Sequence, residues 1–339
     1  ATVEMQAADK YPNIRLFTVG QGTSSIVPFY DLQTIEQTWS VSSQQAVGGA
    51  STADPKFGYF SAVCWLFGKE LFEKINVPIG LVNNNWGGTQ VELWSPKSAF
   101  DACKREAPSG GNGALYNAMI VPYTVGRSGV VWFGEVFICT VRLTITLITP
   151  IFLWFHTTAP PQPRSYSPTL GPMALAGFTW YQGEANTVDA SSANEYACLF
   201  PAMITSWRSV FKIPSAYFGF VQLSTWCEDE GIAEMRDAQL KALELPNVGY
   251  GTNADHGAGC DIHPPPKQFC AHRLANSALA LKYGKEIQWR SPEFVKFKST
   301  TKPVQLSTEE LAADKDNFVA SFSVEVQFDH LSPEGSAFH

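Results

Sequence analysis

Short apolar runs alternate with segments of helical periodicity along most of this chain, and this alternation constrains the fold more than any other feature. Apolar runs of about 4–8 residues predict strands, and they occupy residues 14–19, 79–82, 178–181, 216–223 and 248–252. Apolar residues at helical spacing predict helices at residues 60–75, 95–103, 114–121, 190–211, 231–243 and 265–283. Strands separated by helices indicate parallel βαβ units. A ligand site is then expected beyond the carboxyl ends of the strands.

Two regions depart from this alternation. Residues 28–55 are polar and rich in turn-forming residues, and we expect no regular element there. After Gly284, residues 295–298 and 319–328 alternate apolar with polar side chains, which is a strand pattern. We therefore expect an α/β domain over residues 1–285 and a partial β-rich domain over residues 286–339.

Residues 127–171 are atypical of such a domain and are expected to be an insertion in it. They combine an apolar run at 130–155 with a Pro-rich stretch. Because Glu135, Arg142 and Pro150 interrupt the run, a membrane span is disfavoured. Our leading hypothesis is translated non-coding sequence such as a retained intron, and the alternatives are a real loop or lid and a membrane anchor.

Composition and charge exclude several classes of function. A net charge of −7 without a basic cluster argues against a nucleic-acid partner. The seven cysteines show no zinc-ligand spacing, and no glycine cluster has phosphate-loop spacing, so neither metal nor cofactor is expected. Cys64 is expected to be a small core residue. Cys260 and Cys270 could staple the segment between them, and unpaired thiols are the alternative.

Three segments carry chemistry, and each follows a predicted strand. Asp261-Ile262-His263-Pro264 places an acid two residues before a histidine, a pattern that suits a base and the group orienting it. Asn85-Trp86-Gly87-Gly88-Thr89 and Gln182-Gly183-Glu184-Ala185-Asn186 are turns that bear glycines and amides. Such turns can donate hydrogen bonds to an oxyanion. Asp255 is the alternative acid, His256 is expected in the same loop, and His272 is expected to face solvent.

These segments, in this order, resemble the sialate O-acetylesterase family of SGNH-type hydrolases. Further segments carry the same resemblance, namely 60–68, 78–82, 92–94, 115–120, 235–240 and 267–268. The resemblance covers roughly residues 8–126 and 172–285. It implies a three-layer α/β/α flavodoxin-like domain followed by the start of a C-terminal β domain. Omitting residues 127–171 restores a family-like continuation.

The resemblance also implies an activity and a set of site residues. The activity is removal of O-acetyl groups from sialic acids or other O-acetylated sugars through an acyl-enzyme formed by a serine. His263 would be the base and Asp261 its orienter. The oxyanion donors would come from Gly87, Gly88, Asn186 and Gln182. The substrate-binding residues would be Trp86, Trp180, Tyr116 and Glu184.

The chain departs from the family pattern at the nucleophile. The family carries a Gly-Gln-Ser-Asn-Met turn that should precede residues 11–17, and no such turn follows Ala1. Residues 20–25 offer only a superficial substitute. We therefore expect this chain to be nearly inactive as given, and the alternatives are a non-catalytic carbohydrate-binding relative or an acetylesterase acting on other glycans. The family implies a secreted or lysosomal protein, although no signal peptide is visible at Ala1.

Overall fold

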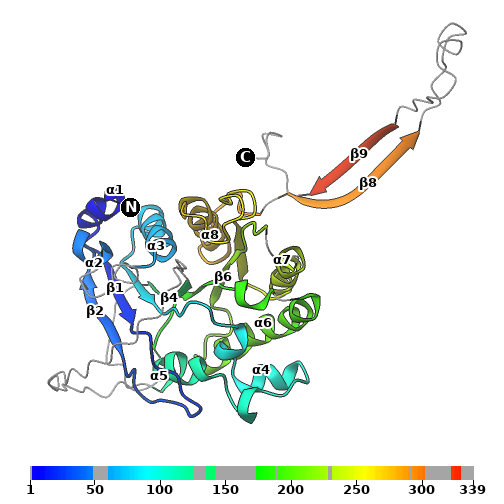
Figure 1. The fold of residues 1–339 in the computed structure, drawn as a ribbon. Coiled ribbons are helices and arrows are strands. Elements are labelled where there is room, and N and C mark those ends of the chain that lie inside the picture. Colours follow the sequence, from blue (N-terminus) through cyan, green and yellow to red (C-terminus); the bar gives the residue numbers. More distant parts are fainter. Residues whose placement is uncertain are drawn as a thin grey trace, which may run out of the picture. The chain divides into compact units, whose positions relative to one another are not determined.

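A seven-stranded sheet organises the unit Ala1–Trp289 in the computed structural model of this protein (Figure 1). The structure describes residues 2–48, 60–125, 135–141, 173–187, 189–227, 231–290, 292–301 and 322–329. The strands run in the order β2-β1-β3-β4-β5-β6-β7. Their bounds are β1 Ile14–Val19, β2 Ile35–Val41, β3 Ile79–Asn83, β4 Glu135–Val141, β5 Gly177–Tyr181, β6 Tyr217–Gln222 and β7 Val248–Thr252.

Helices cover both faces of the sheet, as parallel strands joined by crossovers require. On one face α3 packs against α8, and on the other α6 packs against α7 (Figure 1). β3 and β5 are buried at every position because both of their faces are covered. The helices are α1 Thr2–Ala7, α2 Gln44–Gly48, α3 Ala62–Ile75, α4 Lys97–Ala102, α5 Val121–Thr124, α6 Ala190–Val210, α7 Ile232–Leu240 and α8 Gln268–Leu281.

Two helices begin or end differently from the sequence-based expectation because of proline. The segment expected to stop before Pro122 instead continues from a π-helical turn, η4 Tyr116–Ile120, into α5. Pro122 lies in the first turn of α5, where its missing N–H leaves no intrahelical hydrogen bond unmade. The last helix was expected from residue 265 but begins at Gln268, after the three consecutive prolines.

β2 is one of two strands of this sheet that the sequence did not predict, the other being β4. It lies at the edge of the sheet and pairs antiparallel with β1. Most of its residues are at least partly exposed, so it lacks the apolar run by which buried strands are recognised. Trp39 is its main apolar contact, with its ring 5.5 Å from that of Phe17.

β4 lies within the segment that we expected to be an insertion, and here the structure differs from the expectation. It is hydrogen-bonded in parallel to β3 on one side and to β5 on the other. Residues 135–141 are therefore part of the sheet and not an appendage to it. The rest of residues 127–171 lies outside the described residues.

The cysteines pair differently from the expectation. Cys64 on α3 forms a disulfide with Cys139 on β4 and is not an isolated core thiol. Cys260 pairs with Cys227, so the His263 segment is joined to another cysteine, a pairing that the sequence left open. Cys270 is a buried free thiol on α8. A third disulfide joins Cys103, which directly follows α4, to Cys198 within α6.

Residues Arg290–His339 form a second unit. Its described part consists of β8 Glu293–Thr301 and β9 Phe322–Asp329, which pair antiparallel. The strands fall in the region that was expected to be rich in β structure. The division after Trp289 lies close to the boundary expected after residue 285.

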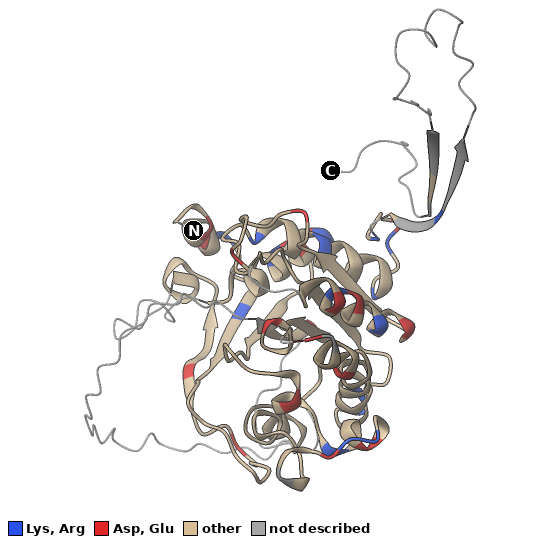
Figure 2. Ribbon diagram, turned by 45° about the vertical axis from the view of Figure 1, so that its right-hand side comes forward, with Lys and Arg blue, Asp and Glu red and all other residues tan. Residues whose placement is uncertain are grey.

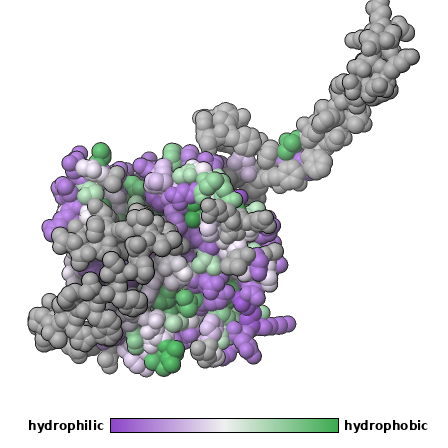
Figure 3. All heavy atoms as spheres, viewed as in Figure 1, coloured by the Kyte–Doolittle hydropathy of each residue, from purple (hydrophilic) through white to green (hydrophobic). Residues whose placement is uncertain are grey.

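In the two views of Figures 2 and 3, neither one sign of charge nor apolar character dominates the described residues that can be seen. Figure 2 shows acidic and basic residues interspersed over the described ribbon. Figure 3 shows polar and apolar residues mixed wherever no grey atoms cover the visible face. No helix among the described residues has the length and apolar character that crossing a membrane requires.

Candidate functional site

A pocket lies at the carboxyl edge of β3, β4 and β5, where a parallel sheet is expected to bind ligands. Its free space is about 270 Å³, including its opening to solvent. Its lining residues are Asn85, Trp86, Thr89, Trp94, Thr140, Tyr181, Gln182 and Glu184.

The first glycine turn follows β3 and forms one wall of the pocket. Gly87 and Gly88 lie between the lining residues Trp86 and Thr89. Gly88 has φ +74°, a conformation that glycine adopts without the steric cost of a Cβ. The Thr89 hydroxyl donates to the Trp86 carbonyl at 2.7 Å and so closes the turn.

The second turn follows β5 and is tied to the first by its side-chain amides. Gln182 Nε2 donates to the Thr89 carbonyl at 3.0 Å and to Asn186 Oδ1 at 2.8 Å. Asn186 Oδ1 also accepts from the Val91 N–H at 3.0 Å. Both N–H groups of the Gln182 amide are thus engaged within the protein. Asn186 is buried behind the pocket wall and is not among the residues that line it.

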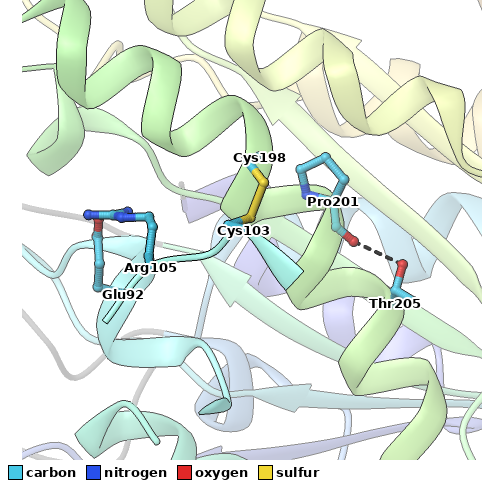
Figure 4. Close-up of a disulfide and its surroundings, with 6 residues drawn as sticks. All are labelled: Glu92, Cys103, Arg105, Cys198, Pro201 and Thr205. Carbon is cyan, nitrogen blue, oxygen red and sulfur yellow. Dashed lines mark hydrogen bonds and ion pairs between the residues drawn. A yellow bond between two sulfur atoms is a disulfide. The ribbon is translucent and has the colours of Figure 1, made fainter. Parts of the chain in front are cut away.

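Glu92 anchors this network from the short helix η2 Val91–Trp94. Its Oε2 accepts from Asn186 Nδ2 at 2.9 Å, and its Oε1 lies 3.4 Å from Arg105 Nη1. Arg105 follows Cys103, whose disulfide to Cys198 holds this segment against α6 (Figure 4). The second glycine turn is therefore connected to the disulfide through Glu92 and Arg105.

The loop of His263 and Asp261 begins after β7 and is stapled by the disulfide between Cys227 and Cys260. Asp261 Oδ1 accepts from the His263 backbone N–H at 2.8 Å and lies 3.8 Å from His263 Nδ1. The carboxylate is thus close to the imidazole without a hydrogen bond to it. Catalytic hydrogen bonds are often long in unliganded enzymes, so this geometry is compatible with an orienting role.

The other acid and histidines near this loop have partners of their own. Asp255 makes two hydrogen bonds to the Arg273 guanidinium, at 2.6 and 2.7 Å. The His256 ring stacks on Phe269 with centroids 3.6 Å apart. His272 is exposed, as expected, and its Nδ1 lies 2.6 Å from Glu70 Oε1. Asp255 is therefore a poor orienter for His263 in this arrangement.

Buried charges lie between the pocket and the His263 loop. Lys267 is buried with its Nζ 5.2 Å from the centre of the Tyr181 ring, and burial lowers the pKa of its ammonium. Burial raises the pKa of the Tyr181 hydroxyl well above its usual value, and the charges of Glu184 and Asp261 add to the shift. Asp261 thus lies within electrostatic reach of a residue that lines the pocket.

Two aromatic residues expected to bind substrate are placed in the core. Trp180 is fully buried, and its indole N–H donates to the Tyr196 hydroxyl at 3.2 Å. Tyr116 is buried on η4, and burial raises the pKa of its hydroxyl to about 12. Neither lines the pocket, because each points into the packed interior. Trp86 and Glu184 do line the pocket.

Sequence reasoning missed Thr140, Asn85 and Thr89 as pocket residues. Asn85 and Thr89 stood beside the predicted glycines and could have been included with them. No sequence pattern indicated Thr140, because residues 127–171 were interpreted as an insertion. Among the described residues, no group of three or more His, Cys, Asp or Glu is placed to hold a metal ion.

Comparisons with known proteins agree with one another. Residues 165–263 match the family described as carbohydrate esterase, sialic acid-specific acetylesterase. The sialate O-acetylesterase of Rattus norvegicus is 31% identical over 323 residues, which cover 86% of this chain and 55% of that protein. Its Homo sapiens counterpart is 29% identical over 310 residues, covering 84% and 50%. This chain therefore spans about half the length of the curated relatives it matches.

A solved structure shows the same likeness. The carbohydrate acetylesterase from Xanthomonas citri superposes with a TM-score of 0.63 at 27% identity, covering 89% of this chain and 56% of that chain. The similarity extends through the sheet that carries the pocket, since so much of this chain is covered.

Proposed function

Because this chain belongs to the sialate O-acetylesterase family of carbohydrate esterases, we propose that its pocket binds the acetyl ester of an O-acetylated sialic acid or related sugar. One observation carries the proposal: the two glycine turns that follow β3 and β5, the strands on either side of β4, line the same pocket.

The proposed mechanism is acyl transfer to a serine in the longer protein, followed by hydrolysis of the acyl-enzyme. Serine attack forms a bond to the acetyl carbon, and the sugar oxygen leaves with a proton. His263 would take the serine proton and return it to the sugar oxygen, and Asp261 would stabilise the imidazolium. Backbone N–H groups of Gly87 and Gly88 would stabilise the oxyanion. The SGNH assignment belongs to the same proposal.

The experiment measures acetate release from an O-acetylated sialic acid glycoside by a protein that carries the proposed nucleophilic serine together with this chain. We expect His263→Asn to lower the rate by about 10²–10⁴-fold, the usual contribution of general acid–base catalysis. His272→Asn is the matched control, since His272 lies exposed on α8 and should leave the rate unchanged.

Two other outcomes decide between the alternatives. Binding of the acetylated sugar without acetate release would favour a carbohydrate-binding relative without catalytic activity. Acetate release from other acetylated glycans alone would keep the mechanism and change the substrate. Neither binding nor release from any acetylated sugar would contradict the proposal.

A further inference from the structure

Thr140 lies on β4 and lines the pocket. It pairs in register with Trp180 of β5 and is 5% exposed. Its Oγ1 is buried and has no hydrogen-bond partner in the part of the chain that the structure describes. A buried hydroxyl without a partner costs folding free energy. In a pocket, an atom of a bound ligand can supply the missing hydrogen-bond partner.

The neighbouring polar side chains of the pocket already have partners. The Thr89 hydroxyl donates to the Trp86 carbonyl and accepts from the Trp94 indole at 3.0 Å. The Tyr181 hydroxyl accepts from Asn253 Nδ2 at 3.1 Å.

The pocket amides are engaged in the same way. Asn85 Oδ1 accepts from Gln21 Nε2 at 2.9 Å, and Asn85 Nδ2 donates to Asn83. The Gln182 amide donates to the Thr89 carbonyl and to Asn186. Of the hydroxyls that line the pocket, Thr140 alone lacks a protein partner among the described residues.

We propose that Thr140 Oγ1 donates a hydrogen bond to the carbonyl oxygen of the bound acetyl ester and thereby selects the acetylated sugar over the deacetylated one. The inference rests on the proposed function and adds a substrate-binding residue to it. The carbonyl oxygen is an acceptor that the deacetylated sugar lacks. Because Thr140 lines the pocket that is proposed to bind the acetyl ester, its hydroxyl is placed to meet that group.

The test compares Thr140→Val, which removes the hydroxyl at nearly constant shape, with Thr140→Ser, which keeps it. Calorimetric titration uses an O-acetylated sialic acid glycoside and its deacetylated parent. We expect Thr140→Val to weaken binding of the acetylated ligand about tenfold, which is the effect of losing one hydrogen bond to a ligand. Binding of the deacetylated ligand should not change, and Thr140→Ser should retain the preference for the acetylated one.

A stability measurement separates this role from a structural one. Because the Thr140 hydroxyl has no partner among the residues that the structure describes, Thr140→Val should raise Tm while it lowers affinity. Thr179→Val is the matched control. Thr179 lies on β5, is buried, has an unpaired Oγ1 and does not line the pocket. It should raise Tm and leave the affinity for both ligands unchanged.

Each outcome has one meaning. If the wild type binds the acetylated ligand more tightly and Thr140→Val keeps that preference, the inference is wrong and the proposed function stands. If the wild type binds both ligands equally, the ester is not recognised in the pocket and the inference is also wrong. If it binds neither ligand and releases no acetate, the proposed function fails and this inference fails with it.

Discussion

Asp255 is held in the loop after β7 by two hydrogen bonds to Arg273. Burial alone would raise the pKa of this carboxyl, but the hydrogen bonds and charge of Arg273 outweigh it and lower the pKa below its usual 3.8. A carboxyl with a lowered pKa stabilises the fold above its unfolded-state pKa. That contribution is lost as the pH falls through the lower folded-state pKa.

We therefore expect Asp255→Asn to lower Tm at pH 7, and the loss to become smaller as the pH falls through the folded-state pKa of the wild-type carboxyl. The side chain is 42% exposed, so solvent screening should limit the loss at pH 7 to about 0.5 kcal/mol. Thermal unfolding followed by circular dichroism between pH 2 and 7 measures it. Asp101→Asn, which removes an exposed contact to Lys97, is the control, and an equal loss of Tm in both variants would contradict the prediction.

At the scale of residues, the sequence predicted which residues lie close together better than it predicted which way each side chain points. His263 and Asp261 are close in sequence, so their proximity in space was predictable. The sequence could not predict whether Trp180 faces a ligand or the core. Successive residues of a strand point to opposite faces, and both faces of this sheet are covered. Only the packed structure places Trp86 in the pocket wall and Trp180 in the interior.

At the scale of elements, the two glycine turns hold each other in place through Glu92. Its carboxylate fixes Asn186, and Asn186 in turn accepts from Gln182 beside the pocket. Arg105 forms a second ion pair, in which its Nη2 lies 2.5 Å from Glu195 Oε2. A change at Glu92 should therefore move the wall of the pocket without removing any group that lines it.

We expect Glu92→Ala to weaken binding of the O-acetylated ligand about tenfold, because one lost hydrogen bond to a charged group is worth about 1.5–3 kcal/mol and part of it reaches the pocket. Glu92→Gln, which can still accept from Asn186, should be affected less. Calorimetric titration measures both variants. Glu195→Ala removes the other partner of Arg105 and should leave affinity unchanged; if it weakens binding as much as Glu92→Ala, the effect comes from Arg105 and not from Asn186.

The elements that the sequence predicted are those with a clear apolar pattern. β3, β5 and α3 have continuous apolar runs or helical periodicity. β2 was missed because an edge strand carries mostly polar side chains. The central position of β4 was missed because its apolar run continues past the strand, so composition alone could not show where pairing begins and ends.

At the scale of the whole molecule, three disulfides join segments that are 33 to 95 residues apart in sequence. Seven cysteines without recognisable spacing allow many pairings, so the sequence could predict only that one would remain unpaired. The structure leaves Cys270 unpaired, and burial raises the pKa of its thiol to about 11. A thiol so protonated at neutral pH is a poor partner for disulfide exchange.

The boundary between the two units gives the last prediction. Trp289 ends the first unit, and its ring contacts that of Tyr250 with centroids 6.4 Å apart. We expect a chain truncated after Trp289 to keep the Tm of the full chain within about 2 °C, since the core of the first unit is intact. A chain truncated after Gly284 also loses the core contacts of Ile287 and Trp289. It should unfold at least about 4 °C lower, because an aromatic contact and its buried area contribute about 1 kcal/mol or more. Differential scanning calorimetry of the three chains measures this, and equal Tm values for both truncations would show that the first unit ends before Ile287.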